Sequence, residues 1–78
     1  MAKAFVFVNV EVGSETEVLK QLREVPEIKE VVLVYGAYDI VAKVETDSVD
    51  HLKEVIGSKV RRVDKIRSTL TAIVVEGK

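Results

Sequence analysis

Apolar and polar residues alternate from the start of the chain, and this period of two predicts a β-strand over residues 4–12. One face of the predicted strand carries four valines, Val6, Val8, Val10 and Val12. The other face carries Phe5, Phe7, Asn9 and Glu11. Gly13 is expected to end the strand.

The spacing of apolar residues changes to that of a helix after Gly13. Ser14 lies three residues before Glu17, which is the spacing of a capping box at a helix start. An apolar stripe with helical spacing follows at Val18, Leu19, Leu22 and Val25. Pro26 cannot continue a helix, so we expect this helix to end before it.

Two strands joined by a tight turn come next. Residues 28–35 are rich in β-branched side chains and predict the second strand, and residues 39–45 predict the third. The turn between them, residues 35–38, contains Gly36, which adopts a positive φ without steric cost. The two strands are therefore expected to pair as a hairpin.

A second helix and a last strand complete the chain. Asp47 is a favourable N-cap residue for a helix that carries Val49, Leu52, Val55 and Ile56. We expect this helix to stop near Gly57. Residues 58–67 form a basic connection that could include the start of a strand, residues 68–75 alternate as the fourth strand, and residues 76–78 form a tail.

This order of elements, βαββαβ, predicts an α+β protein with the ferredoxin-like fold. Right-handed crossovers place both helices on one face of a four-stranded antiparallel sheet. No linker or repeat interrupts the 78 residues, so we expect a single domain over residues 1–78.

The sheet face without helices is expected to be apolar too. Phe5 and Phe7 lie opposite the valine face of the first strand. In the last strand, Leu70, Ala72 and Val74 alternate with Thr69, Thr71, Ile73 and Val75. Monomers rarely expose so large an apolar patch. We therefore predict a dimer in which this face packs, sheet to sheet, on the same face of a second copy, with Phe5 and Phe7 near the contact.

Composition supports an oligomer and narrows the classes of function. A chain this short is near the lower limit for a self-sufficient core, and with no Cys and one His neither disulfides nor a metal site is expected to reinforce it. Lys and Arg (12) nearly balance Asp and Glu (13), which argues against direct DNA binding. No membrane span or signal peptide is seen, so we expect a cytoplasmic protein, without cofactors. The Glu-, Lys- and Val-rich composition resembles thermophile usage.

The chain offers few groups for catalysis, and we expect that it is not an enzyme. Ser14 and Ser48 lie at helix starts without a His or Lys placed to activate them. His51 lies mid-helix among polar neighbours, as a surface residue would. The alternative is a small dimeric αβ-barrel enzyme, of the cofactor-free monooxygenase or isomerase type. Such an enzyme would enclose His51 or Asp39 in an apolar cavity within one dimer.

The strongest charge run is basic and consists of Lys59, Arg61, Arg62, Lys65 and Arg67, interrupted by Asp64. It lacks the interleaved aromatic residues of a single-stranded nucleic-acid-binding surface. We interpret it as a solvated connection that forms salt bridges within the oligomer.

Asp39 is unusual because a carboxylate begins an apolar strand, where its β propensity is poor. It could cap the backbone of the preceding turn, or it could receive a cationic group of a ligand. Physical reasoning from the residues leaves both interpretations open.

Three segments resemble the C-terminal domain of the Lrp/AsnC (feast/famine) transcription regulators, called RAM for regulation of amino-acid metabolism. They are residues 25–31, residues 35–41 with a Gly-x-Tyr-Asp turn, and residues 67–75 with a Thr-x-Thr strand. The similarity covers essentially the whole chain. Full-length regulators of this family also carry an N-terminal helix-turn-helix domain. Here the first strand begins almost at Met1, so the chain resembles a stand-alone RAM module.

The resemblance implies a function and a site. Members of this family pair through their sheets, assemble further into rings, and bind small effectors, typically amino acids, between dimers. Carried onto this sequence, the ligand-binding residues would be Leu33, Gly36, Tyr38, Asp39, Thr69, Thr71 and Ile73. The chain would then be an amino-acid-responsive module that modulates full-length Lrp/AsnC regulators by assembling with them. Ala37 is apolar where many relatives carry a polar residue, so the effector's identity stays open.

Overall fold

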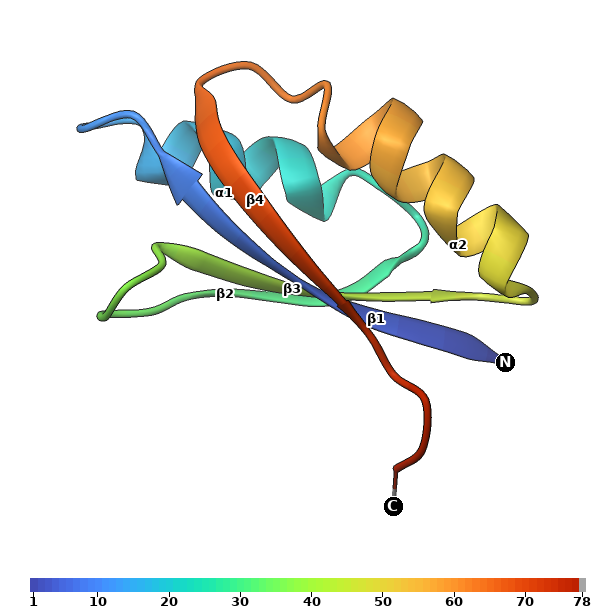
Figure 1. Ribbon diagram of the computed structural model, residues 1–78. Helices are drawn as coiled ribbons and strands as arrows, with labels where there is room; N and C mark the ends of the chain where they lie inside the picture. Colours follow the sequence, from blue (N-terminus) through green and yellow to red (C-terminus); the bar gives the residue numbers. More distant parts are fainter. Residues whose placement is uncertain (78) are drawn as a thin grey trace.

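The computed structural model describes residues 1–77 and contains a four-stranded antiparallel sheet with two helices on one side of it (Figure 1). The elements in chain order are β1 (Ala2–Val10), α1 (Glu15–Arg23), β2 (Ile28–Leu33), β3 (Ile40–Thr46), α2 (Val49–Val55), a wider helical turn η1 (Ile56–Val60) and β4 (Ile66–Ile73). The predicted ferredoxin-like βαββαβ fold is confirmed. Within the described residues, no helix has both the length and the apolar character needed to cross a membrane.

β1 and β3 are the inner strands, since the order across the sheet is β2–β3–β1–β4. One row of paired residues crosses all four strands. Leu33 pairs with Ile40, Ile40 with Val8, and Val8 with Thr69. Residues directly opposite each other in an antiparallel ladder share a face. Leu33 and Thr69 therefore lie on the same face but at opposite edges, three strand spacings or about 14 Å apart.

The hydrophobic core lies between the helices and the inner strands. Its fully buried large side chains include Val6, Val8, Val18, Leu22, Ile40, Val44, Leu52, Val55 and Val60. Apart from Val60, these residues fall on the strand and helix patterns read from the sequence. The predicted apolar stripes of both helices are buried at most positions, but Val49, assigned to the stripe of the second helix, is 45% exposed.

The opposite face of the sheet has no helix from residues 1–77 over it (Figure 1). The register places Phe5, Phe7 and Leu70 on this open face. Phe5 is 38% exposed and Leu70 is 51% exposed, whereas Val6, the next residue along β1, is completely buried. The open face is therefore apolar around Phe5, Phe7 and Leu70, but it also carries charged side chains, since Lys43 lies opposite Phe5 and pairs with Glu45.

The first strand was predicted two residues too late, at 4–12 instead of Ala2–Val10. The chain turns after Val10, and the Ser14 amide donates a hydrogen bond to the Glu11 carbonyl at 2.9 Å. Val12 was assigned to the core-facing set but lies in this turn and is 94% exposed. The alternation predicted β1 correctly only as far as Val10.

The predicted boundaries of the other strands also differ from the structure. β2 ends at Leu33 and β3 begins at Ile40, so the connection spans residues 34–39 rather than 35–38. The Val34 amide still bonds to the Asp39 carbonyl at 2.9 Å, which closes this longer hairpin loop. β4 covers Ile66–Ile73 instead of residues 68–75.

Both predicted helix caps were wrong in detail. The Ser14 side chain makes no capping hydrogen bond, because its backbone (φ −104°, ψ 9°) is not in the extended conformation of an N-cap. Ser48, rather than Asp47, caps α2: its backbone is extended, and its hydroxyl accepts from the His51 amide at 3.1 Å. Asp47 instead bonds to the His51 ring at 2.9 Å.

The second helix does not stop near Gly57, as predicted. Winding continues with wider turns through Val60, and the Arg61 amide bonds to the Ile56 carbonyl, five residues earlier, at 2.9 Å. Val60 is completely buried, so continuing the helix adds one more apolar side chain to the core. Residues 58–60 are thus helical and not part of a basic connection.

Candidate functional site

The seven predicted ligand-binding residues fall into two groups. Leu33, Gly36, Tyr38 and Asp39 lie on and around the β2–β3 connection, whereas Thr69, Thr71 and Ile73 lie on β4. β2 and β4 are the two edge strands, on opposite sides of β3 and β1. None of the four hollows described below on residues 1–77 is lined by members of both groups. One chain therefore does not assemble the predicted site.

Asp39 is held against β1 by its side chain and its backbone. Its Oδ2 accepts a hydrogen bond from the Val10 amide at 2.9 Å, and its own amide donates to the Val8 carbonyl at 3.0 Å. The Val10 amide lies where the β1–β4 register shifts, so the carboxylate satisfies a backbone donor at an irregular point of the sheet. This geometry supports a capping role. Oδ1 has no hydrogen-bond partner within residues 1–77.

Gly36 and Tyr38 have different surroundings within the same connection. Gly36 has a φ of +150°, and no atom lies within 4 Å of the position a Cβ would take, so its predicted positive φ is confirmed. The Tyr38 ring packs on Phe7 with centroids 5.5 Å apart, which places it beside the open sheet face. Tyr35 is fully exposed and shares an apolar hollow of about 320 Å³ with Leu33 and Val34.

The three predicted residues of β4 line a groove of about 350 Å³ between this strand and α2–η1. The groove forms because α2 packs over β1 and β3, which leaves the helix-facing side of β4 partly uncovered. Its other wall consists of Lys53, Ile56, Gly57 and Arg61. It is thus the one hollow that contains several predicted ligand-binding residues together.

None of the four helix residues of this groove was among the predicted ligand-binding residues. The helix was expected to end near Gly57, because glycine is a common stop signal. The spacing of four between Leu52, Ile56 and Val60 was the signal that the helix continues. That spacing puts Gly57 and Arg61 on a helical wall instead of in a connection.

The basic stretch is divided between different roles. The Lys59 ammonium lies 3.2 Å from Glu27 Oε1, and the Lys65 ammonium lies 3.3 Å from Glu17 Oε1. The salt bridges expected within the oligomer therefore form, for these two residues, within one chain. Arg61 lines the groove instead.

A small polar cluster joins the start of α2 to the residue before β2. His51 Nδ1 lies 2.9 Å from Asp47 Oδ1, and His51 Nε2 lies 4.0 Å from Glu27 Oε2. Hydrogen bonds from a backbone amide and from Lys59 lower the pKa of Glu27. The hydrogen bond with His51 lowers the pKa of Asp47. Residues 1–77 contain no group of three or more His, Cys, Asp or Glu side chains placed to hold a metal ion.

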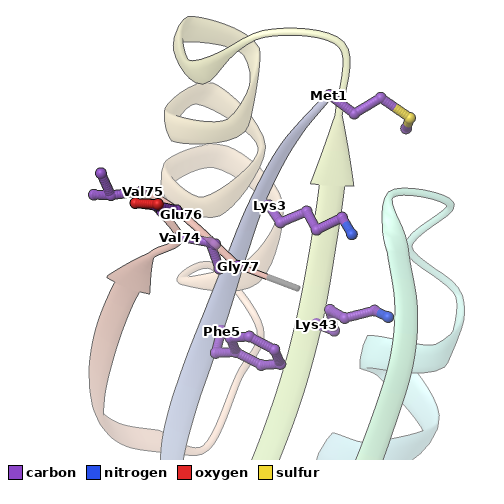
Figure 2. Close-up of a pocket in the computed structure, with 8 residues that line it drawn as sticks. All are labelled: Met1, Lys3, Phe5, Lys43, Val74, Val75, Glu76 and Gly77. Carbon is purple, nitrogen blue, oxygen red and sulfur yellow. The ribbon is translucent and has the colours of Figure 1, made fainter.

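Another hollow, of about 450 Å³, lies on the open face beneath the segment that follows β4 (Figure 2). Figure 2 shows Lys3 and Phe5 on β1, and Lys43 beside them on β3, with residues 74–77 crossing nearby. Lys43 is paired with Glu45 at 3.4 Å. A second copy packed on the open face would cover this hollow, so it is a weaker candidate for an effector site than the α2–β4 groove.

Residues 3–77 match the family model described as the Lrp/AsnC ligand binding domain. An uncharacterised HTH-type transcriptional regulator of Pyrococcus abyssi is 33% identical over 70 residues, which cover 90% of this chain and 44% of that protein. Homocitrate synthase of Sulfurisphaera tokodaii is 38% identical over 61 residues, which cover 78% of this chain and 13% of that protein. The chain thus spans less than half the length of these relatives. The thermophile-like composition fits relatives from Pyrococcus.

Solved structures share the fold. FFRP-DM1 is 40% identical with a TM-score of 0.91, over 96% of this chain and 100% of that chain. AsnC of E. coli is 28% identical with a TM-score of 0.91, over 97% of this chain and 52% of that chain. A transcriptional regulator of Neisseria meningitidis, solved in complex with L-Met, is 13% identical with a TM-score of 0.83, over 96% of this chain and 50% of that chain, and shows the fold alone.

Proposed function

Because the chain belongs to the Lrp/AsnC ligand-binding domain family, we propose that it is a regulatory module that binds an amino-acid effector between two copies of itself. The observation that carries the proposal is that the predicted ligand-binding residues are spread over the sheet of one chain: Leu33 lies on the edge strand β2, Asp39 contacts the inner strand β1, and the three β4 residues line the groove at the opposite edge. A site that uses both groups needs the β2–β3 connection of one copy and the α2–β4 groove of another. Effector binding and assembly are then thermodynamically linked.

The first step of this assembly, in our proposal, is the pairing of two open sheet faces. Phe5, Phe7 and Leu70 supply apolar side chains to that face, and Phe7 and Tyr38 already pack against each other. Sheets packed face to face interdigitate such side chains. A stable pair needs roughly 800 Å² from each partner, which requires most of this face. The free β2–β3 connections and grooves then remain at the edges of the pair for further assembly.

The chemistry of both groups suits an amino acid. The free Oδ1 of Asp39 is an acceptor for an α-ammonium, and the hydroxyls of Thr69 and Thr71 are donors for an α-carboxylate. The L-Met complex of the Neisseria regulator supports an amino acid as ligand of this fold. We therefore propose that Asp39 both caps β1 and anchors the effector.

The module acts, we propose, through other copies of the family. The relatives named as HTH-type regulators are more than twice as long as the matched segment. This chain would then act at a promoter by assembling with such longer subunits. The similar segment in homocitrate synthase supports a module whose partners extend beyond DNA-binding proteins. Both described helices pack on the sheet, so we propose that residues 1–77 do not themselves read DNA.

The enzyme alternative would require His51 or Asp39 to line an apolar cavity. Neither residue lines any of the four hollows described above, and His51 pairs with Asp47 on the surface. No observation on the described residues therefore favours catalysis, and we propose a function in binding and regulation.

Titration calorimetry against all twenty amino acids tests this proposal, together with light-scattering masses measured with and without each ligand that binds. We expect at least one amino acid to bind and to stabilise an assembly of two or more chains. Tight binding to a single chain would contradict a site between copies. A complete absence of binding would contradict the amino-acid effector.

A further inference from the structure

The α2–β4 groove carries two cationic side chains without acidic partners. Lys53, Gly57 and Arg61 follow each other at intervals of four residues along α2–η1, and all three line the groove. Neither Lys53 nor Arg61 makes an ion pair with another group of residues 1–77. Of the other lysines in residues 1–77, Lys43, Lys59 and Lys65 pair with a glutamate within 4.0 Å, whereas Lys3, Lys20 and Lys29 do not. The groove lining itself contains no carboxylate.

The opposite wall adds hydrogen-bond donors. The Val74 amide bonds to the Lys3 carbonyl at 2.9 Å, which makes this a hydrogen-bonded pair of the β1–β4 ladder. Because such pairs alternate along an antiparallel ladder, the backbone groups of Thr69, Thr71 and Ile73 point away from β1, at the free edge of the sheet. The two threonine side chains therefore stand on the helix-facing side of β4, in the groove lining, and the N–H groups of this edge point outward beside it.

The space between the cations is open. Gly57 lies midway between Lys53 and Arg61, and a Cβ added there would have no atom within 4 Å. The missing side chain leaves the apolar surface of Ile56 and Ile73 as the floor of the groove. The volume, about 350 Å³, is at the lower end of the range for small-molecule sites. A compact metabolite with charged ends fits such a groove better than a bulky apolar one.

We propose that this groove selects a small dicarboxylate, so that the effector of the module is an acidic amino acid or the 2-oxo acid of the same carbon skeleton. Arg61 pairs with one carboxylate through its planar guanidinium, and Lys53 neutralises the other. The threonine hydroxyls complete the carboxylate contacts. The inference rests on the proposed function for the role of the groove as effector site, and it adds the charge and class of the ligand.

The test is calorimetry on the full chain with L-glutamate, L-aspartate, 2-oxoglutarate and succinate, against L-glutamine and L-leucine. We expect at least one dicarboxylate to bind tenfold more tightly than L-glutamine. Arg61→Gln should weaken that binding at least tenfold. Arg62→Gln is the matched control, because Arg62 is the exposed neighbour outside the groove lining, and it should change the affinity less than twofold.

A second variant tests the space rather than the charge. Gly57→Leu places a side chain between the two cations, while leucine is a better helix former than glycine. We expect unchanged circular dichroism and an unchanged or higher melting temperature, with dicarboxylate binding weakened at least tenfold. Full binding by this variant would overturn the placement of the ligand in the groove.

The ligand panel separates the failure of this inference from the failure of the proposed function. If L-glutamine or L-leucine binds as tightly as L-glutamate, the dicarboxylate inference is wrong and the amino-acid module stands. If 2-oxoglutarate or succinate binds and no amino acid does, the inference stands and the amino-acid effector is wrong. Absence of binding by the whole panel would contradict the dicarboxylate site.

Discussion

Both faces of the sheet carry apolar side chains, but helices of the same chain cover only one of the faces. Val6 and Phe5 are neighbours on β1, yet Val6 is completely buried beneath the helices and Phe5 is 38% exposed on the open face. The strand alternation places apolar side chains on both sides, but the helices of this chain cover only one. The helix-covered face accounts for the stability of the single chain. The open face therefore accounts, in our proposal, for its association with a second copy.

Truncating one leucine on each face gives the largest contrast. Leu22 is completely buried under α1, so Leu22→Ala should lower the free energy of unfolding by about 2–5 kcal/mol. Leu70 is 51% exposed on the open face, and Leu70→Ala should lower the stability of a single chain by only about 0.5 kcal/mol. Urea unfolding over a range of protein concentrations measures both. If both variants lose the same free energy of unfolding at the lowest protein concentration, the two faces do not differ in their contribution to the stability of a single chain.

A charge on the open face should disrupt assembly while leaving the core intact. Phe7→Asp places a carboxylate among apolar side chains, and we expect the dimer dissociation constant to rise about a hundredfold, or by about 2.7 kcal/mol. Val12→Asp is the matched control, because Val12 is 94% exposed beyond the end of β1 and should leave the mass unchanged. Light scattering over a dilution series checks both. If Phe7→Asp leaves the dimer dissociation constant unchanged, the contact between copies does not involve the open face around Phe7.

Two substitutions of Asp39 separate its roles at the edge of the open face. Asp39→Ala removes the acceptor of the Val10 amide and should cost about 1–3 kcal/mol of stability. Asp39→Asn retains an acceptor oxygen, so the fold and the assembly should be nearly unchanged. If Asp39 also anchors an α-ammonium, the asparagine variant should lose at least tenfold in amino-acid affinity. Unchanged affinity in Asp39→Asn would leave capping as its only role.

The smallest expected effect is a pH dependence on the helix-covered side. Glu27 and Asp47 have pKa values lowered from 4.5 and 3.8. A carboxyl with a lowered pKa binds protons less readily in the folded chain, so its stabilising effect is complete above its ordinary value and is lost as the pH falls through the lowered one. Glu27→Gln should therefore reduce stability at pH 6, and its difference from the parent protein should shrink below about pH 4.

Thermal unfolding between pH 3 and pH 7 measures this difference. Glu24→Gln is the matched control, since Glu24 is exposed and forms no ion pair within residues 1–77. The effect should be small because the Glu27 carboxylate is near solvent. If Glu27→Gln changes the melting temperature by the same amount at pH 3 and at pH 6, the lowered pKa of Glu27 does not contribute to stability.

The fold was predictable because each element carries its own local pattern. Buried positions match the strand alternation at Val6 and Val8. They also match the apolar stripes of the two helices, at Leu22 in α1 and at Leu52 in α2. The boundaries were less predictable, because they depend on tertiary contacts. The helix passes Gly57 since Val60 reaches the core, and the cap is Ser48 because its backbone is extended where β3 ends.

The candidate site was predictable only in part. The resemblance supplied residues on both edges of the sheet, including Leu33 and Thr71, but the strand order that separates them emerges only from the sheet topology. Lys53 and Arg61 carry no motif of their own. They enter the site because α2 and η1 lie beside β4, an arrangement that no local pattern records.

The central claim is that a second copy completes this module, both at its open face and at its effector site. The mass of the unmodified protein by multi-angle light scattering, over a dilution series without ligand, tests that claim most directly. We expect at least two chains per particle, with larger assemblies favoured when an effector is added. The mass of one chain at every concentration, with or without effector, would contradict it.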